Sequence, residues 1–149
     1  MVIRSREELE NYYETNKTVY GLERKEQVYS DTTIGFLDAC DKYDETFFEE
    51  HDLIFAVLEE GSGSIRHEVA NILRNGENGA WEVGIKTITP EAGTCDMAQW
   101  HIMIELPKGT VGEGEKVCAV YEGQAQLVQY SHGDAALDIL GTARLGVKP

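Results

Sequence analysis

The segment from residue 53 to residue 106 places the strongest constraint on what this chain can fold into. It opens with a continuous apolar run, LIFAVL, and continues through three runs in which apolar and polar residues largely alternate. Glycine-containing stretches, GSGS, NGENG and PEAG, separate the four runs. Period-two alternation between glycine turns is typical of β-strands. The segment therefore predicts four antiparallel strands joined by glycine-marked turns, with the NGENG turn as a tight hairpin.

The alternation also predicts which side chains face the core. The apolar run at 53–58 needs cover on both faces, so we expect it to be a central strand. The residues predicted to face inward from the other three strands are Ile65, His67 and Val69, then Trp81, Val83 and Ile85, and then Trp100, Ile102, Ile104 and Leu106. His101, Met103 and Glu105 are predicted on the opposite face of the last strand.

Two amphipathic helices are predicted before this segment. Ser5 and Glu8 form a capping-box pattern, which predicts a helix over about residues 6–16. A second helix is predicted after Asp31 or Thr32, because apolar residues then recur at the spacing of one helical face. Its apolar stripe consists of Phe36, Cys40 and Tyr43. Asp44 is expected to cap a further short helical turn.

These elements predict an α+β fold: a mainly antiparallel, twisted sheet of five to six strands, with two N-terminal helices packed on it. The fifth strand is expected at 116–122 and the sixth at 125–130. The 149 residues are interpreted as a single domain spanning 1–149, with its core sheet at about 53–130. In the tail, residues 131–149, a short helix after Asp134 is one interpretation.

Charge and cysteine content exclude several classes of function. The formal net charge of −14 would repel nucleic acid, so we expect no nucleic-acid partner. No apolar run approaches the roughly 18 residues needed to span a membrane, so no membrane insertion by this segment is expected. The start, MVIRSREE, lacks the apolar core of a signal peptide. Three cysteines without a CxxC pair argue against a disulfide-rich scaffold and a zinc site.

No reactive centre emerges from the remaining motifs. The predicted sheet places His67 and His101 on opposite faces, so they cannot share a metal ion, and no metal or other cofactor is predicted. Cys95 lies in a turn beside Asp96, and an adjacent carboxylate disfavours the thiolate that a nucleophile requires. The GSGS turn leads into a strand, whereas phosphate-binding loops lead into a helix. We therefore predict no catalytic residue; a small hydrolase using Cys95 or His101 is the alternative.

The turns GSGSIRH and PEAGTCDMAQW are the best candidates for a binding surface. In a four-strand meander, both turns emerge at the same end of the sheet, and binding residues often gather on loops. The alternative is two ordinary turns over a core tryptophan. The predicted binding residues are Ser62, Ser64, Arg66, Thr94, Asp96, Gln99 and Trp100.

The run from residue 47 to residue 106 resembles a family of domains. It has paired aromatics before an apolar strand, a glycine-rich turn into a second strand, and a Pro-x-x-Gly loop before the last strand. These features resemble domains of uncharacterised secreted or lipid-anchored proteins of Gram-positive gut bacteria. They are more remotely similar to the C-terminal domain of PrcB-like proteins. The resemblance implies a small, non-catalytic, extracytoplasmic domain and supplies no catalytic residues.

Together, these observations predict a non-enzymatic, extracytoplasmic interaction module that binds or stabilises a partner protein. We expect it to be secreted or anchored at the cell surface, with a cytoplasmic location left open. Besides the hydrolase, a second alternative is a small-ligand binder with an apolar pocket under the helices.

Overall fold

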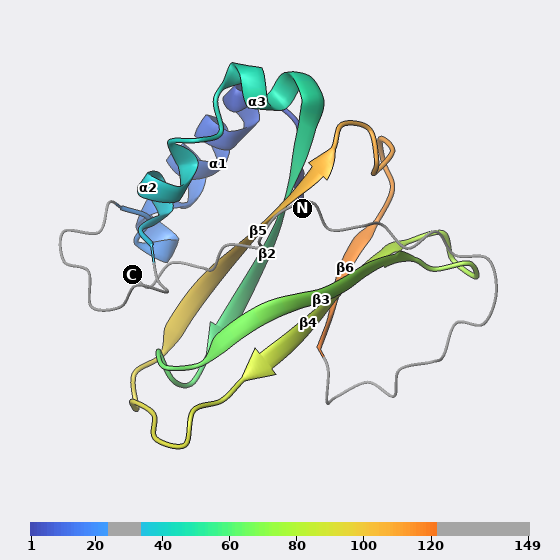
Figure 1. Cartoon of the computed structure of the whole chain (residues 1–149). Helices are drawn as coiled ribbons and strands as arrows, with labels where there is room; N and C mark the ends of the chain where they lie inside the picture. Colours follow the sequence, from blue (N-terminus) through green and yellow to red (C-terminus); the bar gives the residue numbers. More distant parts are fainter. Residues whose placement is uncertain (24–33, 122–149) are drawn as a thin grey trace.

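The computed structural model describes residues 1–23 and 34–121 of the chain (Figure 1). Its elements, in chain order, are β1 (Val2–Ile3), α1 (Arg6–Tyr20), α2 (Phe36–Cys40), α3 (Glu45–Glu50), β2 (His51–Glu60), β3 (Arg66–Arg74), β4 (Trp81–Ile88), β5 (Ala98–Pro107) and β6 (Val117–Tyr121). The predicted strand at 125–130 and the predicted helix after Asp134 lie outside the described residues.

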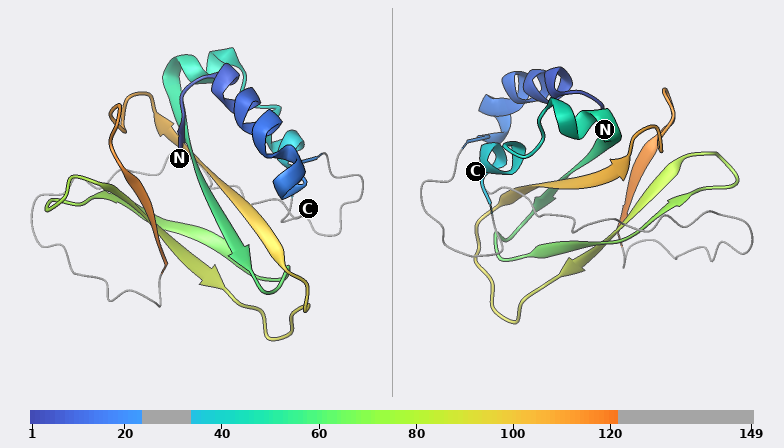
Figure 2. Two further views of the ribbon diagram at one scale, coloured as in Figure 1. Left: turned by 180° about the vertical axis from the view of Figure 1, so that it is seen from behind. Right: turned by 45° about the horizontal axis from the view of Figure 1, so that its top comes forward.

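The described strands form two sheets of three strands. The first sheet has the order β1-β2-β5 and the second has the order β3-β4-β6. All neighbouring strands are antiparallel except β4 and β6, which are parallel. The helices cover one face of the first sheet, and the second sheet lies across its other face (Figures 1 and 2). The α+β class is thus confirmed, whereas the single sheet of five to six strands is wrong.

The glycine turns explain this difference. The sequence pattern predicts that the turns after residues 60 and 88 connect neighbouring strands within one sheet. Instead, both turns carry the chain from one sheet to the other, so that β2 pairs with β5 and β3 pairs with β4. Only the turn between β3 and β4 is a hairpin, as predicted. In it the Gly79 N–H donates to the Asn75 carbonyl (2.8 Å), and Gly79 adopts a positive φ of 68°.

The larger core lies between the two sheets. The predicted inward faces of β4 and β5 are confirmed, because their apolar residues are buried together against the alternate residues of β2. This core comprises Ile54, Ala56, Leu58, Ile72, Trp81, Val83, Ile85, Ala98, Trp100, Ile102, Ile104, Leu106 and Val111. Close packing of two inner sheet faces is the principle of a β-sandwich.

A second core lies between the helices and the first sheet. Leu53 and Phe55 of β2 and Met103 of β5 point into it, opposite to the residues that face the second sheet. β2 is therefore covered on both faces and flanked by strands on both sides, as predicted for a central strand. The helical and flanking residues of this core are Leu9, Tyr12, Leu22, Phe36, Cys40, Tyr43 and Phe48.

The helices differ in detail from their predictions. The Ser5 hydroxyl accepts from the Glu8 N–H (3.1 Å), but the Glu8 carboxylate accepts from the N–H of Arg4 rather than that of Ser5. α1 extends to residue 20, beyond the predicted end at 16, because the left-handed Gly21 ends it. The further helical turn predicted after Asp44 is confirmed as α3, where the Asp44 side chain accepts from the Phe47 N–H (2.9 Å). α2 has only five residues and ends at Cys40, before Tyr43. The predicted caps of the second helix, at 31 and 32, lie outside the described residues.

Candidate binding surface at the crossover loops

Two loops pass between the sheets at the same end of the molecule. The first, residues 61–65, joins β2 to β3, and the second, residues 89–97, joins β4 to β5. β2 and β4 both run toward this end, so the two loops lie side by side there (Figures 1 and 2). We call residues 61–65 and 89–97 together the crossover loops.

Serine and threonine hydroxyls join the crossover loops to each other. The Thr94 hydroxyl lies 3.2 Å from the Ser64 hydroxyl and 3.4 Å from that of Ser62, and the Thr94 N–H donates to the Ser64 oxygen (3.2 Å). The Gly63 N–H donates to the Asp96 carboxylate across the same gap (3.3 Å). The predicted juxtaposition of Ser62, Ser64, Thr94 and Asp96 is therefore confirmed. Their role in binding stays a prediction.

Glycine at position 93 permits this close approach. A Cβ atom built there would lie 3.0 Å from the Ser62 hydroxyl oxygen, closer than a side chain normally tolerates. The loops are therefore packed against each other as well as hydrogen-bonded.

Arg66 and Trp100 support the loops from below. The Arg66 guanidinium donates to the carbonyls of Gly63 (2.8 Å) and Ile65 (3.0 Å), and its central carbon lies 5.0 Å from the centre of the Trp100 ring. Trp100 is only 1% exposed and belongs to the core between the sheets. Trp100 can therefore contribute to binding only through the shape of loop 61–65, whereas Arg66 is half-buried.

Gln99 lies at the margin of the surface and crosses to the neighbouring strand. Its side-chain N–H donates to the Glu59 carboxylate of β2 (3.0 Å). Glu59 itself is exposed, so this pair presents a carboxylate beside the crossover loops.

Two exposed apolar side chains of this region were not among the predicted binding residues. Met97 is 76% exposed at the end of loop 89–97, and Ile88 is 40% exposed where that loop begins. The exposure of Met97 could have been predicted from the sequence. The alternation of β5 starts at Ala98, so Met97, the residue before it, falls on a loop. The surface thus combines ordered hydroxyls with two exposed apolar side chains.

A buried histidine lies directly beneath the first loop. His67 is 1% exposed, as its predicted inward position requires, and its Nε2 lies 2.7 Å from the Glu60 carboxylate. Its Nδ1 makes no hydrogen bond within the described part of the chain. The contact connects the end of β2 to the beginning of β3, so it fixes both ends of loop 61–65.

His101 lies on the other face of the first sheet, as predicted relative to its neighbours in β5. Its Nε2 is 2.8 Å from the Tyr12 hydroxyl, and the rings of Tyr20 and Phe36 pack edge-on against it, with centroids 5.2 and 5.3 Å away. Burial lowers the pKa of His101 from 6.5 to about 4, so the imidazole is neutral at physiological pH. His67 and His101 therefore lie in different layers, and within residues 1–23 and 34–121 no cluster of three or more metal-binding side chains occurs.

The residues of the hydrolase alternative are not equally accessible. Cys95 is an exposed free thiol in loop 89–97, whereas His101 is 1% exposed beneath the helices. A substrate cannot reach the His101 imidazole in this arrangement, so His101 is a poor candidate for catalysis. Cys40 and Cys118 are also free thiols, the first buried and the second exposed.

Among the described residues, no helix has the length and apolar character needed to cross a membrane. Comparisons with protein-family models, curated proteins and solved structures found no match to this chain.

Proposed function

We propose that this chain is a non-enzymatic interaction module, which binds a partner protein through its crossover loops. The observation that carries the proposal is the set of hydroxyl and carboxylate contacts among Ser62, Gly63, Ser64, Thr94 and Asp96, which holds both loops in one arrangement. A surface that is ordered before binding loses little conformational entropy when a partner docks.

The chemistry of the loops supports a protein as the partner. Met97 and Ile88 offer apolar contact area, and the surrounding hydroxyls can donate or accept hydrogen bonds. An apolar centre with a polar rim is the usual composition of a protein interface. Methionine is well suited to such a contact, because its flexible thioether adapts to the facing surface.

Charge indicates what kind of protein surface would fit. Glu59 is exposed near the end of β2 and Glu91 within loop 89–97, and the Asp96 carboxylate accepts from the Gly63 N–H in the same region. The Arg66 guanidinium at this end is directed at backbone carbonyls and at Trp100. A partner with a basic patch would be attracted by this end of the molecule and oriented during association.

Site-specific photo-crosslinking tests the proposal. A photoreactive amino acid is placed at Met97, and a second protein carries it at Val19, which is similarly exposed (71%) but lies near the end of α1. After irradiation in cells of the source organism, we expect one discrete adduct from position 97 and none from position 19. Adducts of equal yield at both positions, or none at position 97, would contradict the proposal.

A loop variant tests whether the fixed arrangement of the crossover loops is needed for binding. Thr94→Val keeps the shape of the side chain but removes the hydroxyl that faces both loop serines. We expect the adduct at position 97 to decrease in this variant, because the loops lose part of their fixed arrangement. Thr46→Val, an equivalent change on the exposed surface of α3, should leave the adduct unchanged.

We also propose that the module works outside the cytoplasm, secreted or anchored at the cell surface. The support for this is the resemblance of residues 47–106 to domains of secreted and lipid-anchored proteins. Fractionation of the source cells, with detection by an antibody against the chain, tests it. Recovery in the cytoplasmic fraction alone would be the contrary result.

A further inference from the structure

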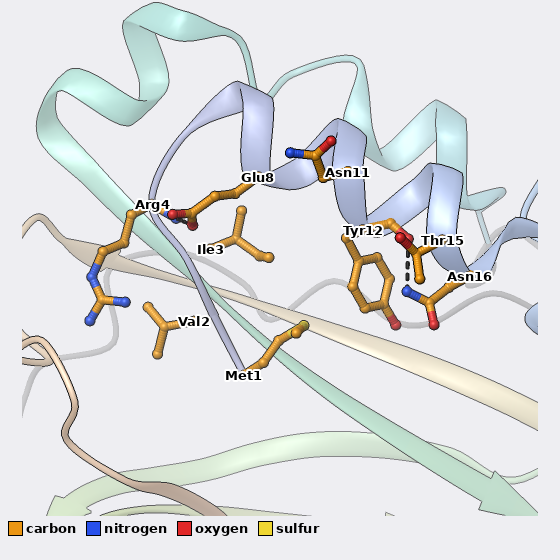
Figure 3. Close-up of a pocket in the computed structure, with 9 residues that line it drawn as sticks. All are labelled: Met1, Val2, Ile3, Arg4, Glu8, Asn11, Tyr12, Thr15 and Asn16. Carbon is orange, nitrogen blue, oxygen red and sulfur yellow. Dashed lines mark hydrogen bonds between the residues drawn. The ribbon is translucent and has the colours of Figure 1, made fainter.

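A groove lies between the edge strand β1 and the helix α1, away from the crossover loops. It has a volume of about 420 Å³, within the range of roughly 300–1,000 Å³ typical of ligand sites. One side of the groove is β1 with the residues at its two ends. The other side is a stripe of α1 side chains, Glu8, Asn11, Tyr12, Thr15 and Asn16, which recur at the spacing of one helical face (Figure 3). We call it the α1–β1 groove.

The backbone of β1 has hydrogen-bonding groups directed to its open edge. Met1 exchanges both of its backbone hydrogen bonds with Phe55 of β2, at 2.8 and 2.9 Å. In an antiparallel pair such residues alternate with residues whose N–H and C=O point to the other side. The N–H and C=O of Val2 therefore face away from β2. β1 has no second neighbour among the described strands, so these two groups are available to an added strand.

The next outward-facing N–H of this edge, that of Arg4, is bonded to a side chain of α1. Arg4 has the same orientation as Val2, and its N–H donates to the Glu8 carboxylate (2.7 Å) rather than to β2. The Glu8 side chain of α1 thus occupies the place beside Arg4 that a carbonyl of an added strand would take. This contact also anchors the Glu8 carboxylate at the rim of the groove.

Three charged groups line the groove: the Met1 ammonium, the Arg4 guanidinium and the Glu8 carboxylate. The ammonium donates to the Phe55 carbonyl of β2 (2.8 Å). The Arg4 guanidinium donates to the carbonyls of Val111 (2.9 Å) and Gly112 (3.1 Å), and Figure 3 shows its side chain directed away from the α1 stripe. Glu8 forms no ion pair within the described part of the chain. The neighbouring Asn11 and Thr15 are neutral and can donate or accept hydrogen bonds. Both cations donate to backbone carbonyls, and Glu8 is the one carboxylate among the lining residues, so a cationic side chain is the complement that Glu8 would bind.

We propose that the α1–β1 groove binds an extended peptide segment that carries lysine or arginine. The segment would add to β1 as a further strand, pairing its backbone with Val2, and would place a cationic side chain on Glu8. Addition of a strand to a sheet edge is a common mode of peptide recognition, in which the backbone supplies affinity and alternate side chains supply specificity. This site is separate from the crossover loops, so either binding function can exist without the other.

Fluorescence anisotropy with three labelled hexapeptides tests the proposal. The peptides alternate threonine with lysine, glutamate or glutamine, and binding is measured to the full chain at an ionic strength of about 0.15 M. We expect saturable binding of the lysine peptide only. Glu8→Gln should weaken that binding about tenfold, because the amide keeps the contact to the Arg4 N–H but loses the charge. Glu7→Gln, the same change at an exposed neighbour outside the groove, should leave the affinity unchanged.

Two further measurements separate strand addition from simple attraction between charges. A lysine peptide with N-methylated backbone amides should not bind, because it cannot pair with Val2. Val2→Pro, which removes an N–H that β2 does not use, should abolish binding and leave the thermal unfolding temperature close to that of the unmodified chain. The proposal is overturned if the lysine peptide fails to bind, if the methylated peptide binds equally well, or if Glu7→Gln weakens binding as much as Glu8→Gln does. Equally effective competition by free lysine amide would also overturn it, since the groove would then be a small-molecule site.

Discussion

The buried His101 should make the stability of this fold depend on pH. Its imidazole is 1% exposed between β5 and α1, and burial lowers its pKa to about 4. In the unfolded chain the same imidazole has its ordinary pKa of 6.5. Between these two values, the unfolded chain binds a proton that the folded chain does not bind. Stability should therefore rise with pH through this window and fall on acidification.

The size of the effect follows from the two pKa values. A separation between 6.5 and about 4, at about 1.36 kcal/mol per pH unit, corresponds to roughly 3 kcal/mol. This stability is fully present above pH 6.5 and is lost progressively as the pH falls to about 4. Below that value both states are protonated, and His101 contributes no further change. Since small domains have a total stability of about 5–15 kcal/mol, the loss is large enough to measure.

The variant for this test must remove the titration without leaving a buried polar group unpaired. His101→Phe alone would strand the Tyr12 hydroxyl, which lies 2.8 Å from the imidazole. Tyr12→Phe together with His101→Phe removes both partners, and replacing both members of a buried hydrogen bond by apolar groups is nearly neutral. The single variant Tyr12→Phe keeps the histidine and should retain the full pH dependence.

Urea unfolding of the three proteins at several values between about pH 7 and pH 4 measures the effect. The chain has 27 acidic residues that titrate in part of the same range, so the informative quantity is the difference between proteins at each pH. The unmodified chain should lose about 3 kcal/mol more than the double variant across this range. Parallel profiles would refute the reasoning. So would an NMR titration of the folded chain in which the His101 imidazole protonates near pH 6.5.

Three other changes test local features of the fold. Gly84→Ala places a Cβ atom 2.4 Å from the Asn71 amide oxygen; urea unfolding should show a loss of about 1–3 kcal/mol, largely restored by adding Asn71→Ala. Asp44→Ala removes the cap of α3 and should reduce the free energy of unfolding by about 1 kcal/mol. Thr94→Val should speed amide hydrogen exchange in residues 61–65 while changing global stability by less than about 0.5 kcal/mol, so an unchanged exchange rate would contradict the role assigned to its hydroxyl.

Side-chain direction was predictable because it is a local property of a strand. Alternation in β4 and β5 correctly placed Trp81 and Trp100 inward and His101 on the opposite face. Sheet membership depends on which strands pair, and that is decided by contacts far apart in sequence. β2 pairs with β5 in the register Leu53 to Glu105, across about fifty residues, which no local pattern encodes. The partition into two sheets was therefore missed.

Turn residues could not distinguish a hairpin from a crossover. Glycine and serine permit a sharp change of direction whether the next strand joins the same sheet or the facing one. Loop 61–65 has a length that fits either connection. The strand at 53–58 is apolar on both faces and needs a cover on each. A crossover lets the second sheet cover one face while the helices cover the other. That cover was predicted, but the identity of the covering layer was not.

The juxtaposition of the crossover loops was predicted correctly although the topology behind it was wrong. In a meander, alternate turns fall at the same end of one sheet. In the two sheets observed, β2 and β4 still run in the same direction, so the connections that follow them still meet. The prediction therefore depended only on strand direction, which both arrangements share. The contacts between Ser64 and Thr94 were beyond it, because they require the loop conformations themselves.

Each crossover loop joins two sheets that share one core, which explains why the loops can be ordered without regular structure. Loop 61–65 follows the buried Leu58 by a few residues and precedes the buried His67, and loop 89–97 ends at the buried Ala98. Each loop is thus fixed close to its ends by side chains of the shared core. The entropy of ordering the short stretch between these points is offset largely by folding of the core itself. A partner that docks on Met97 would then meet a surface already in place, which is the property that the proposed interaction requires.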